Sequence, residues 1–217
     1  MDTDAILLSL KLALWTLAII IPFGIWVAYS LLSLNRSKPW IEAGLALPLV
    51  LPPTVLGYYL LVGLGGKSIF GVPLVFSFAG ILIASLIVNL PFAIQPIQRA
   101  FEAINPEIRE AAQVSGLSKW QIFRLIELPL AWRGVTSAAV LTFAHTLGEF
   151  GVVLMVGGAI PGETKTVSIA IYDKVQSFDT SGAGALASLL LGISLIAIAL
   201  SYGVFGKGSQ RLNRGKS

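Results

Sequence analysis

The chain has 217 residues, of which 55% are hydrophobic and only 12% are charged, and its mean hydropathy is +0.83. Soluble domains carry roughly a quarter charged residues, so this composition indicates an integral membrane protein in one compact unit. The chain contains no cysteine and one histidine, which excludes thiolate metal sites, thiol catalysis and polyhistidine metal sites. The net charge of +4 is explained by membrane topology and does not indicate a nucleic-acid partner.

We expect five membrane-spanning helices, because a helical span needs about 20 mostly apolar residues. The five apolar stretches are 6–34, 41–63, 78–98, 130–157 and 183–205. Pro22 predicts a kink or a tilt in the first of them. Pro48 and the pair Pro52-Pro53 predict that the second is partly broken and lines a path instead of facing lipid. The sequence therefore predicts an all-α protein with a single transmembrane domain over residues 1–217.

The positions of lysine and arginine favour an N-terminus outside the cell and a C-terminus in the cytoplasm. Cytoplasmic segments are enriched in these residues, and this orientation places eleven inside and four outside. The inside set is Arg36, Lys38, Arg99, Arg109, Lys119, Arg124, Arg133, Lys207, Arg211, Arg214 and Lys216, and the outside set is Lys11, Lys67, Lys165 and Lys174. We expect the first span to be retained in the cell membrane, since Asp2 and Asp4 replace the basic start of a signal peptide. The basic tail, 207–217, is expected to be disordered and cytoplasmic.

The longest cytoplasmic connection, residues 99–129, predicts a helix-turn-helix near the membrane surface. Asn105-Pro106-Glu107 is typical of a helix N-terminus, and Gly116 suits the C-terminal cap of the same helix. Ser118, with Gln121 three residues later, resembles a capping box that opens a second helix.

We expect this second helix to end near Leu128, with Pro129 at the start of the fourth span. The composition of the loop leaves two interpretations open. One is a surface that binds another protein, and the other is an amphipathic helix lying at the interface without a partner.

The same loop contains a spaced motif. It reads Glu110-Ala111-Ala112, three residues, Gly116, nine residues, Ile126, one residue, then Leu128-Pro129. This pattern resembles the coupling loop of the permease subunits of bacterial ABC importers. The resemblance implies that the loop docks on a separate cytoplasmic ATPase subunit and transmits its rearrangements to the membrane helices. The coupling residues it implies are Glu110, Ala111, Ala112, Gly116, Leu117, Trp120, Ile126, Leu128 and Pro129.

Two further segments are similar to the molybdate permease branch of that family, with sulfate permeases as close relatives. They are Gly148-Glu149-Phe150-Gly151 and Pro161-Gly162-Glu163-Thr164, and the second span over Leu47–Tyr58 resembles the same branch. The resemblance implies a type I ABC importer permease fold. It also implies transport of molybdate, with tungstate as a second candidate substrate. Sulfate or thiosulfate transport, or a gradient-driven secondary anion transporter, are the alternatives.

The resemblance also implies a set of partners. The permease would form a homodimer, bind two cytoplasmic ABC ATPase subunits and receive substrate from an extracytoplasmic molybdate-binding protein. The chain itself would bind no cofactor, since ATP and magnesium belong to the ATPase. No glycine-rich phosphate loop of the Walker type is present in the sequence, so we do not expect this chain to hydrolyse ATP.

Four polar residues within the spans are candidates for the translocation path or its gate: Thr54, Asn89, His145 and Glu149. Thr54 and Asn89 lie near prolines, Pro53 and Pro91, that can open a helix. His145 and Glu149 are four residues apart, so they share a helical face within pairing reach. The alternative is that this pair is interhelical and fixes packing, because a carboxylate repels an oxyanion. A direct ligand role for Glu149 is not expected.

The outer segment, residues 158–180, contains charged residues and the apolar run Ile169-Ala170-Ile171-Tyr172. It is expected either to meet the extracytoplasmic binding protein or to form an ordinary re-entrant loop. The apolar run predicts a short excursion back onto the bundle that does not cross the membrane.

Overall fold

The structure is a computed structural model that describes residues 3–66 and 73–213, with 200–213 described by their backbone only. The regular elements within these residues are helices, which confirms the all-α prediction. The α-helices are α1 (Thr3–Leu31), α2 (Lys38–Val50), α3 (Pro53–Leu64), α4 (Phe78–Glu102), α5 (Pro106–Val114), α6 (Lys119–Ile122), α7 (Leu128–Gly148), α8 (Gly151–Gly157), α9 (Val167–Gln176) and α10 (Thr180–Asn213). A π-helical segment, η1 (Phe123–Glu127), joins α6 to α7.

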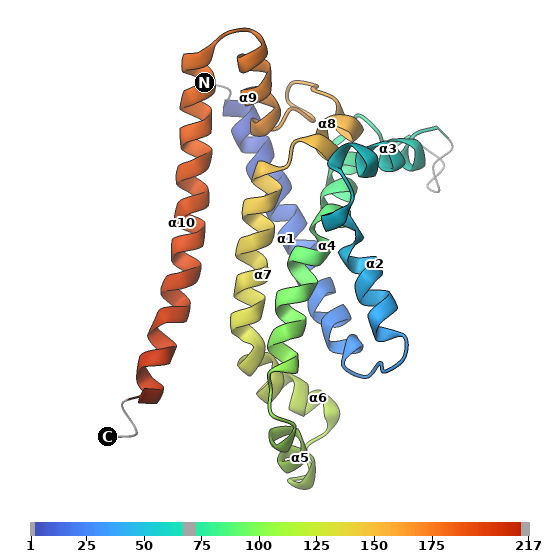
Figure 1. Ribbon diagram of the computed structural model, residues 1–217, viewed down its shortest axis with the longest axis vertical. Helices are drawn as coiled ribbons and strands as arrows, with labels where there is room; N and C mark the ends of the chain where they lie inside the picture. Colours follow the sequence, from blue (N-terminus) through green and yellow to red (C-terminus); the bar gives the residue numbers. More distant parts are fainter. Residues whose placement is uncertain (1–2, 67–72, 214–217) are drawn as a thin grey trace.

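Three long helices, α1, α4 and α7, form the centre of the bundle (Figure 1). Their apolar contacts include the fully buried Ile97 and Phe101 of α4. Small residues let these helices approach closely. A Cβ atom placed on Gly134 of α7 would lie 2.6 Å from the carbonyl oxygen of Pro96, so the backbones of α4 and α7 approach closely at this point.

The described residues contain three helices that are long and apolar enough to cross a membrane. They are α1, α4 and the first part of α10, Thr180–Ala199. Two bent pairs, α2 with α3 and the continuous helix Lys119–Gly148 with α8, raise the number to five if each pair is one span. These five units fall on the five predicted stretches, but only three of them are continuous helices.

The predicted break in the second span is present. The helices α2 and α3 meet at an angle of 106°. Leu51 and Pro52 are both extended there, with ψ of 135° and 137°. A residue that precedes proline is disfavoured in the α conformation, and each of these two residues precedes one. The pair Pro52-Pro53 therefore ends α2 and starts α3.

The predicted fourth span, 130–157, is not one straight helix. The helix α7 ends at Gly148, α8 begins at Gly151, and the two are bent by 60°. Glu149 is extended, with ψ of 127°, and its carboxylate Oε1 accepts a hydrogen bond of 3.0 Å from the N–H of Val152. This bond satisfies a free donor in the first turn of α8. A Cβ atom on Gly151 would lie 2.8 Å from the Cβ of Pro53, so α8 turns to pack on α3.

The predicted boundary between the second loop helix and the fourth span is wrong. The chain passes from α6 through η1 into α7 without a break at Pro129. Pro129 lacks an N–H and would disturb a regular helix at this point. The π-helical turn absorbs the disturbance, with the N–H of Leu128 bonded to the carbonyl of Phe123. The loop helix and the membrane helix are thus one mechanical unit.

The predicted disordered tail differs from the structure in its first part. The helix α10 continues to Asn213, so residues 207–213 are helical. A helix propagates more easily than it nucleates, which explains its extension beyond the apolar residues. Residues 214–217 of the predicted tail lie outside the described residues.

The bundle has two different ends (Figure 1). The short helices α5 and α6 lie at one end, and the last turns of α10 point toward it. The helices α3, α8 and α9 lie at the opposite end, together with the start of α1. The short helices α5 and α6 at one end are therefore separated from α3, α8 and α9 at the other by the length of α4 and α7.

Candidate functional site

The first candidate region is the pair of short helices α5 and α6. Asn105 caps α5, since its side-chain oxygen accepts a 3.0 Å hydrogen bond from the N–H of Glu107. At the other end Gly116 has φ of +82°, and the N–H groups of Gly116 and Leu117 bond to the carbonyls of Gln113 and Ala112. This is a Schellman ending, in which glycine supplies the left-handed residue. Both predicted caps of α5 are confirmed.

The start of α6 is fixed by the predicted capping box. The Ser118 hydroxyl accepts a 3.3 Å hydrogen bond from the N–H of Gln121, and the Gln121 side chain accepts one of 2.8 Å from the N–H of Ser118. Two free donors are satisfied reciprocally. The turn between α5 and α6 is therefore rigid although it is exposed.

The residues of the Glu-Ala-Ala motif divide between surface and interior. Glu110, Ala111, Gly116, Trp120 and Pro129 are exposed, Leu117, Ile126 and Leu128 are half-buried, and Ala112 is buried. Apolar side chains add to the exposed set, above all Val114, which is 90% exposed.

A partly buried ion pair, which sequence reasoning missed, links the two halves of this region. The Arg109 Nε lies 2.5 Å from Oε1 of Glu127, whose side chain is 3% exposed. Arg109 also donates a 2.9 Å hydrogen bond from Nη2 to the carbonyl of Phe101 in α4. One guanidinium thus joins α5, η1 and the end of α4. The only signal in the sequence was a glutamate directly before the Leu128-Pro129 start of an apolar span.

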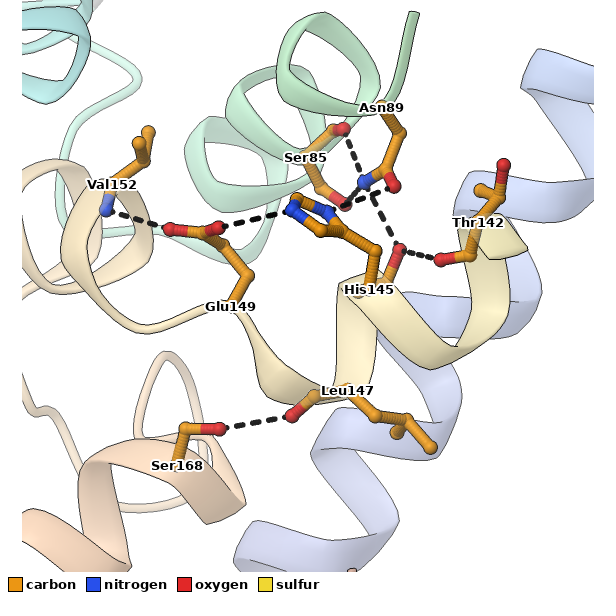
Figure 2. Close-up of polar contacts among 9 residues, drawn as sticks. Ser85, Asn89, Thr142, His145, Leu147, Glu149, Val152 and Ser168 are labelled. Atoms are coloured by element: carbon orange, nitrogen blue, oxygen red, sulfur yellow. Dashed lines mark hydrogen bonds and ion pairs between the residues drawn. The ribbon is translucent and has the colours of Figure 1, made fainter. Parts of the chain in front are cut away.

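The second candidate region is a polar cluster between α4, α7 and the break before α8 (Figure 2). His145 Nδ1 lies 3.2 Å from Oδ1 of Asn89, and His145 Nε2 lies 3.9 Å from Oε2 of Glu149. The imidazole also stacks on Phe92, with ring centroids 4.1 Å apart. Three of the four predicted path residues are therefore together.

Asn89 is the centre of this cluster and is completely buried. Its amide nitrogen donates to the Ser85 carbonyl at 2.8 Å and to the Thr146 hydroxyl at 3.1 Å. The Ser85 hydroxyl in turn lies 2.9 Å from that of Thr16 in α1. Such a network fixes the packing of three helices, because these buried side chains of α1, α4 and α7 bond one another.

Thr54 does not belong to this cluster. It is exposed at the start of α3, next to the Pro52-Pro53 break. The residues of the cluster offer hydroxyl, amide and imidazole groups, which can hydrogen-bond an anion without trapping it as a fixed cation would. Within residues 3–66 and 73–213, no group of three or more histidine, aspartate or glutamate side chains is placed to hold a metal ion.

The segment 158–180 folds back onto the bundle through α9, a helix of ten residues. Ile169 and Ala170 are buried, and the N–H of Val167 donates a 2.8 Å hydrogen bond to the Ser9 hydroxyl of α1. Ten residues span about 15 Å, which is half the hydrocarbon thickness, so α9 does not cross the membrane. The predicted short excursion is confirmed.

Over residues 20–211 the sequence matches the family described as binding-protein-dependent transport system inner membrane component. The chain belongs to this family. This inner membrane component is thus a multi-pass membrane protein, and its apolar helices agree with that.

Two relatives of this inner membrane component are each named molybdenum transport system permease protein ModB. That of Azotobacter vinelandii is 42% identical, covering 93% of both chains, and that of Escherichia coli K12 is 35% identical, covering 92% of both. The sulfate transport system permease protein CysT of Escherichia coli K12 is 30% identical over 81% of this chain and 66% of its own. The molybdenum proteins therefore match more completely than this sulfate protein.

The fold of the component is found in a solved structure. The crystal structure of a bacterial ABC transporter that imports the acidic polysaccharide alginate matches with a TM-score of 0.73, covering 93% of this chain and 79% of the other. At 19% identity this match shows the fold alone. It confirms the predicted ABC importer permease fold.

Proposed function

We propose that this chain is the membrane-spanning permease subunit of an ATP-driven molybdate importer. The observation that carries the proposal is the 42% identity, over 93% of both chains, to a protein named as a molybdenum transport permease. In this proposal two copies of the chain enclose the path at a two-fold axis. Two cytoplasmic ABC ATPase subunits and an extracytoplasmic binding protein complete the importer.

The helices α5 and α6 are the proposed docking element for the ATPase. The two caps of α5, the capping box of α6 and the Arg109–Glu127 ion pair make the element rigid. A rigid element transmits a displacement that a flexible loop would absorb. Because α6 continues through η1 into α7, a movement of the docking element moves a membrane helix directly. This end of the bundle is then cytoplasmic, with the last turns of α10 on the same side.

The polar cluster around Asn89 is the proposed gate of the anion path. His145 and Asn89 offer neutral hydrogen-bonding groups between α4 and α7. Glu149 acts on structure and not on the anion, because its carboxylate caps α8 and would repel an oxyanion. The two breaks, before α3 and before α8, lie on elements that pack together, so a gate movement involves both.

The test uses the permease reconstituted in vesicles with its ATPase and its binding protein. ATP hydrolysis is expected to rise when the binding protein carries molybdate, and Gly116→Pro and Glu110→Lys are expected to remove this rise or to release the ATPase from the membrane. Gly44→Ala is the matched control, since a Cβ atom there meets nothing within 4 Å. Normal stimulation in both loop variants would refute the docking role.

The sulfate alternative is supported by the sulfate permease relative at 30% identity. It is separated from the proposal by uptake of labelled molybdate in competition with sulfate. Free competition by sulfate at equal concentration would favour the sulfate branch. Uptake that follows an ion gradient and needs no ATPase would favour a secondary transporter instead.

A further inference from the structure

A groove lies between the last turns of α1 and the α6–η1 segment. It encloses about 550 Å³ and is lined by apolar and aromatic side chains, including Ile25 and Trp26 of α1 and Trp120 and Phe123 of the α6–η1 segment. Trp26 and Trp120 are 66% and 65% exposed. Exposed tryptophans on both walls of an apolar groove indicate a surface that is covered in the membrane.

A second, polar cavity of about 500 Å³ adjoins the groove, because Tyr29 and Lys119 line both. Ser30, Arg109 and Glu127 also line the polar cavity. Together the two cavities form a trough that is apolar at one end and polar at the other. We call it the α1–α6 trough.

The charge of the α1–α6 trough is positive. Its charged lining residues are Lys119, Arg109 and Glu127, and Arg109 is paired with Glu127. Among the described residues, the Lys119 side chain has no hydrogen bond or ion pair. One free cation therefore stands at the boundary between the apolar and the polar part.

The position of the trough relates it to the membrane. One wall is α1, a helix long and apolar enough to span a bilayer, and the other wall lies at the α5–α6 end of the bundle (Figure 1). Tryptophan is enriched at the level of the lipid head groups, and lysine extends its charge from apolar surroundings toward them. The two tryptophans then place the groove at the head-group level, where its α1 wall continues toward the acyl chains.

We propose that the α1–α6 trough binds an anionic phospholipid. One acyl chain lies along Ile25 and Trp26, and the phosphate pairs with Lys119. The lipid contacts both α1 and α6, so it joins a membrane span to the proposed docking element. The proposal requires only that α1 spans the membrane, and it does not depend on the transported ion.

The test measures which lipids the purified protein retains, using native mass spectrometry from nanodiscs of phosphatidylcholine with phosphatidylglycerol. Wild-type protein is expected to prefer phosphatidylglycerol, and Lys119→Gln to lower this preference about fivefold, the effect of one basic residue near a membrane surface. Lys119→Arg is expected to keep it. Arg124→Gln is the matched control, because Arg124 is an exposed cation of the same segment that does not line the trough.

Two outcomes would overturn the proposal. One is equal retention of the two lipids by wild-type protein, or an unchanged preference in Lys119→Gln. The other is a disulfide-linked dimer of the Trp26→Cys variant in nanodiscs, which would assign the trough to a second copy of the chain. The chain contains no cysteine, so this single substitution reports contact between copies. Trp120→Ala tests the apolar wall, and it is expected to lower retention of both lipids together.

Discussion

Arg109 and the buried Glu127 form a partly buried ion pair that closes the α5–α6 element against the membrane helices. The Arg109 Nε and the Glu127 Oε1 are 2.5 Å apart, although the two residues are eighteen positions apart in the chain. Glu127 lies in the π-helical turn that leads into α7, and Arg109 lies in α5. The pair therefore connects the part that we assign to ATPase docking with the part that moves in the membrane.

Arg109→Gln is expected to destabilise the protein by up to about 3–5 kcal/mol, because it removes the countercharge of the buried Glu127 carboxylate. The double variant Arg109→Gln/Glu127→Gln is expected to recover a large part of this loss, since no uncompensated charge remains. Thermal unfolding in detergent measures the stability of each variant, and stimulated ATP hydrolysis measures its coupling to the ATPase. Arg124→Gln, an exposed arginine of the same loop, is the control. A double variant as unstable as Arg109→Gln would show that the charge of Glu127 is not the cause.

Asn89→Leu is expected to cost about 1–3 kcal/mol, because it removes the buried amide that donates a hydrogen bond to the Thr146 hydroxyl and pairs with His145. Uptake of molybdate is expected to fall more than stability alone explains if the cluster is the gate. Thermal unfolding and the uptake rate are measured on the same preparation. Thr136→Ala is the control, since its exposed hydroxyl bonds only the Trp132 carbonyl of its own helix. Unchanged uptake by a folded Asn89→Leu protein would exclude the gate role.

The start of α10 is expected to respond to acid through Asp179. The N–H of Gly182, bonded at 2.9 Å, and the Lys174 ammonium, at 3.0 Å, hold the pKa of the Asp179 carboxyl below its usual value. A lowered pKa means that the charged carboxylate stabilises the folded state above the usual value of about 4 and that this contribution is lost as the pH falls through the lowered pKa. The difference in melting temperature between wild type and Asp179→Ala is therefore expected to be constant near neutral pH and to shrink below about pH 4. A difference that does not change with pH would contradict this assignment.

Gly134→Ala is expected to destabilise the bundle by about 1–3 kcal/mol, because the new Cβ atom meets the Pro96 carbonyl oxygen of α4 at 2.6 Å. Gly44→Ala is the matched substitution in α2, where a Cβ atom meets nothing within 4 Å. There the better helix propensity of alanine is expected to stabilise by up to about 1 kcal/mol. Thermal unfolding compares the two variants, and equal shifts would show that α4 and α7 separate without cost at this point.

The sequence alone determined the class of the protein, the location of its apolar units and the caps of its short helices. Apolar length indicates membrane spans, and a cap depends on a few neighbouring residues, such as Asn105 before α5 or Ser118 with Gln121 at α6. The break at Pro52-Pro53 was also readable, because proline restricts its own backbone and that of the residue before it. These are local properties, so the residues that cause them stand next to each other in the chain.

The tertiary structure decided what depends on residues that are distant in the sequence. The break at Glu149 lies in an apolar run without proline, and it exists because α8 packs on α3 through Gly151 and Pro53. The Arg109–Glu127 pair and the contact of Asn89 with His145 join residues that are far apart in the chain. A hydrogen bond or an ion pair needs its two atoms within about 3 Å. The folding of α5 onto η1 brings Arg109 to Glu127, and the packing of α4 on α7 brings Asn89 to His145.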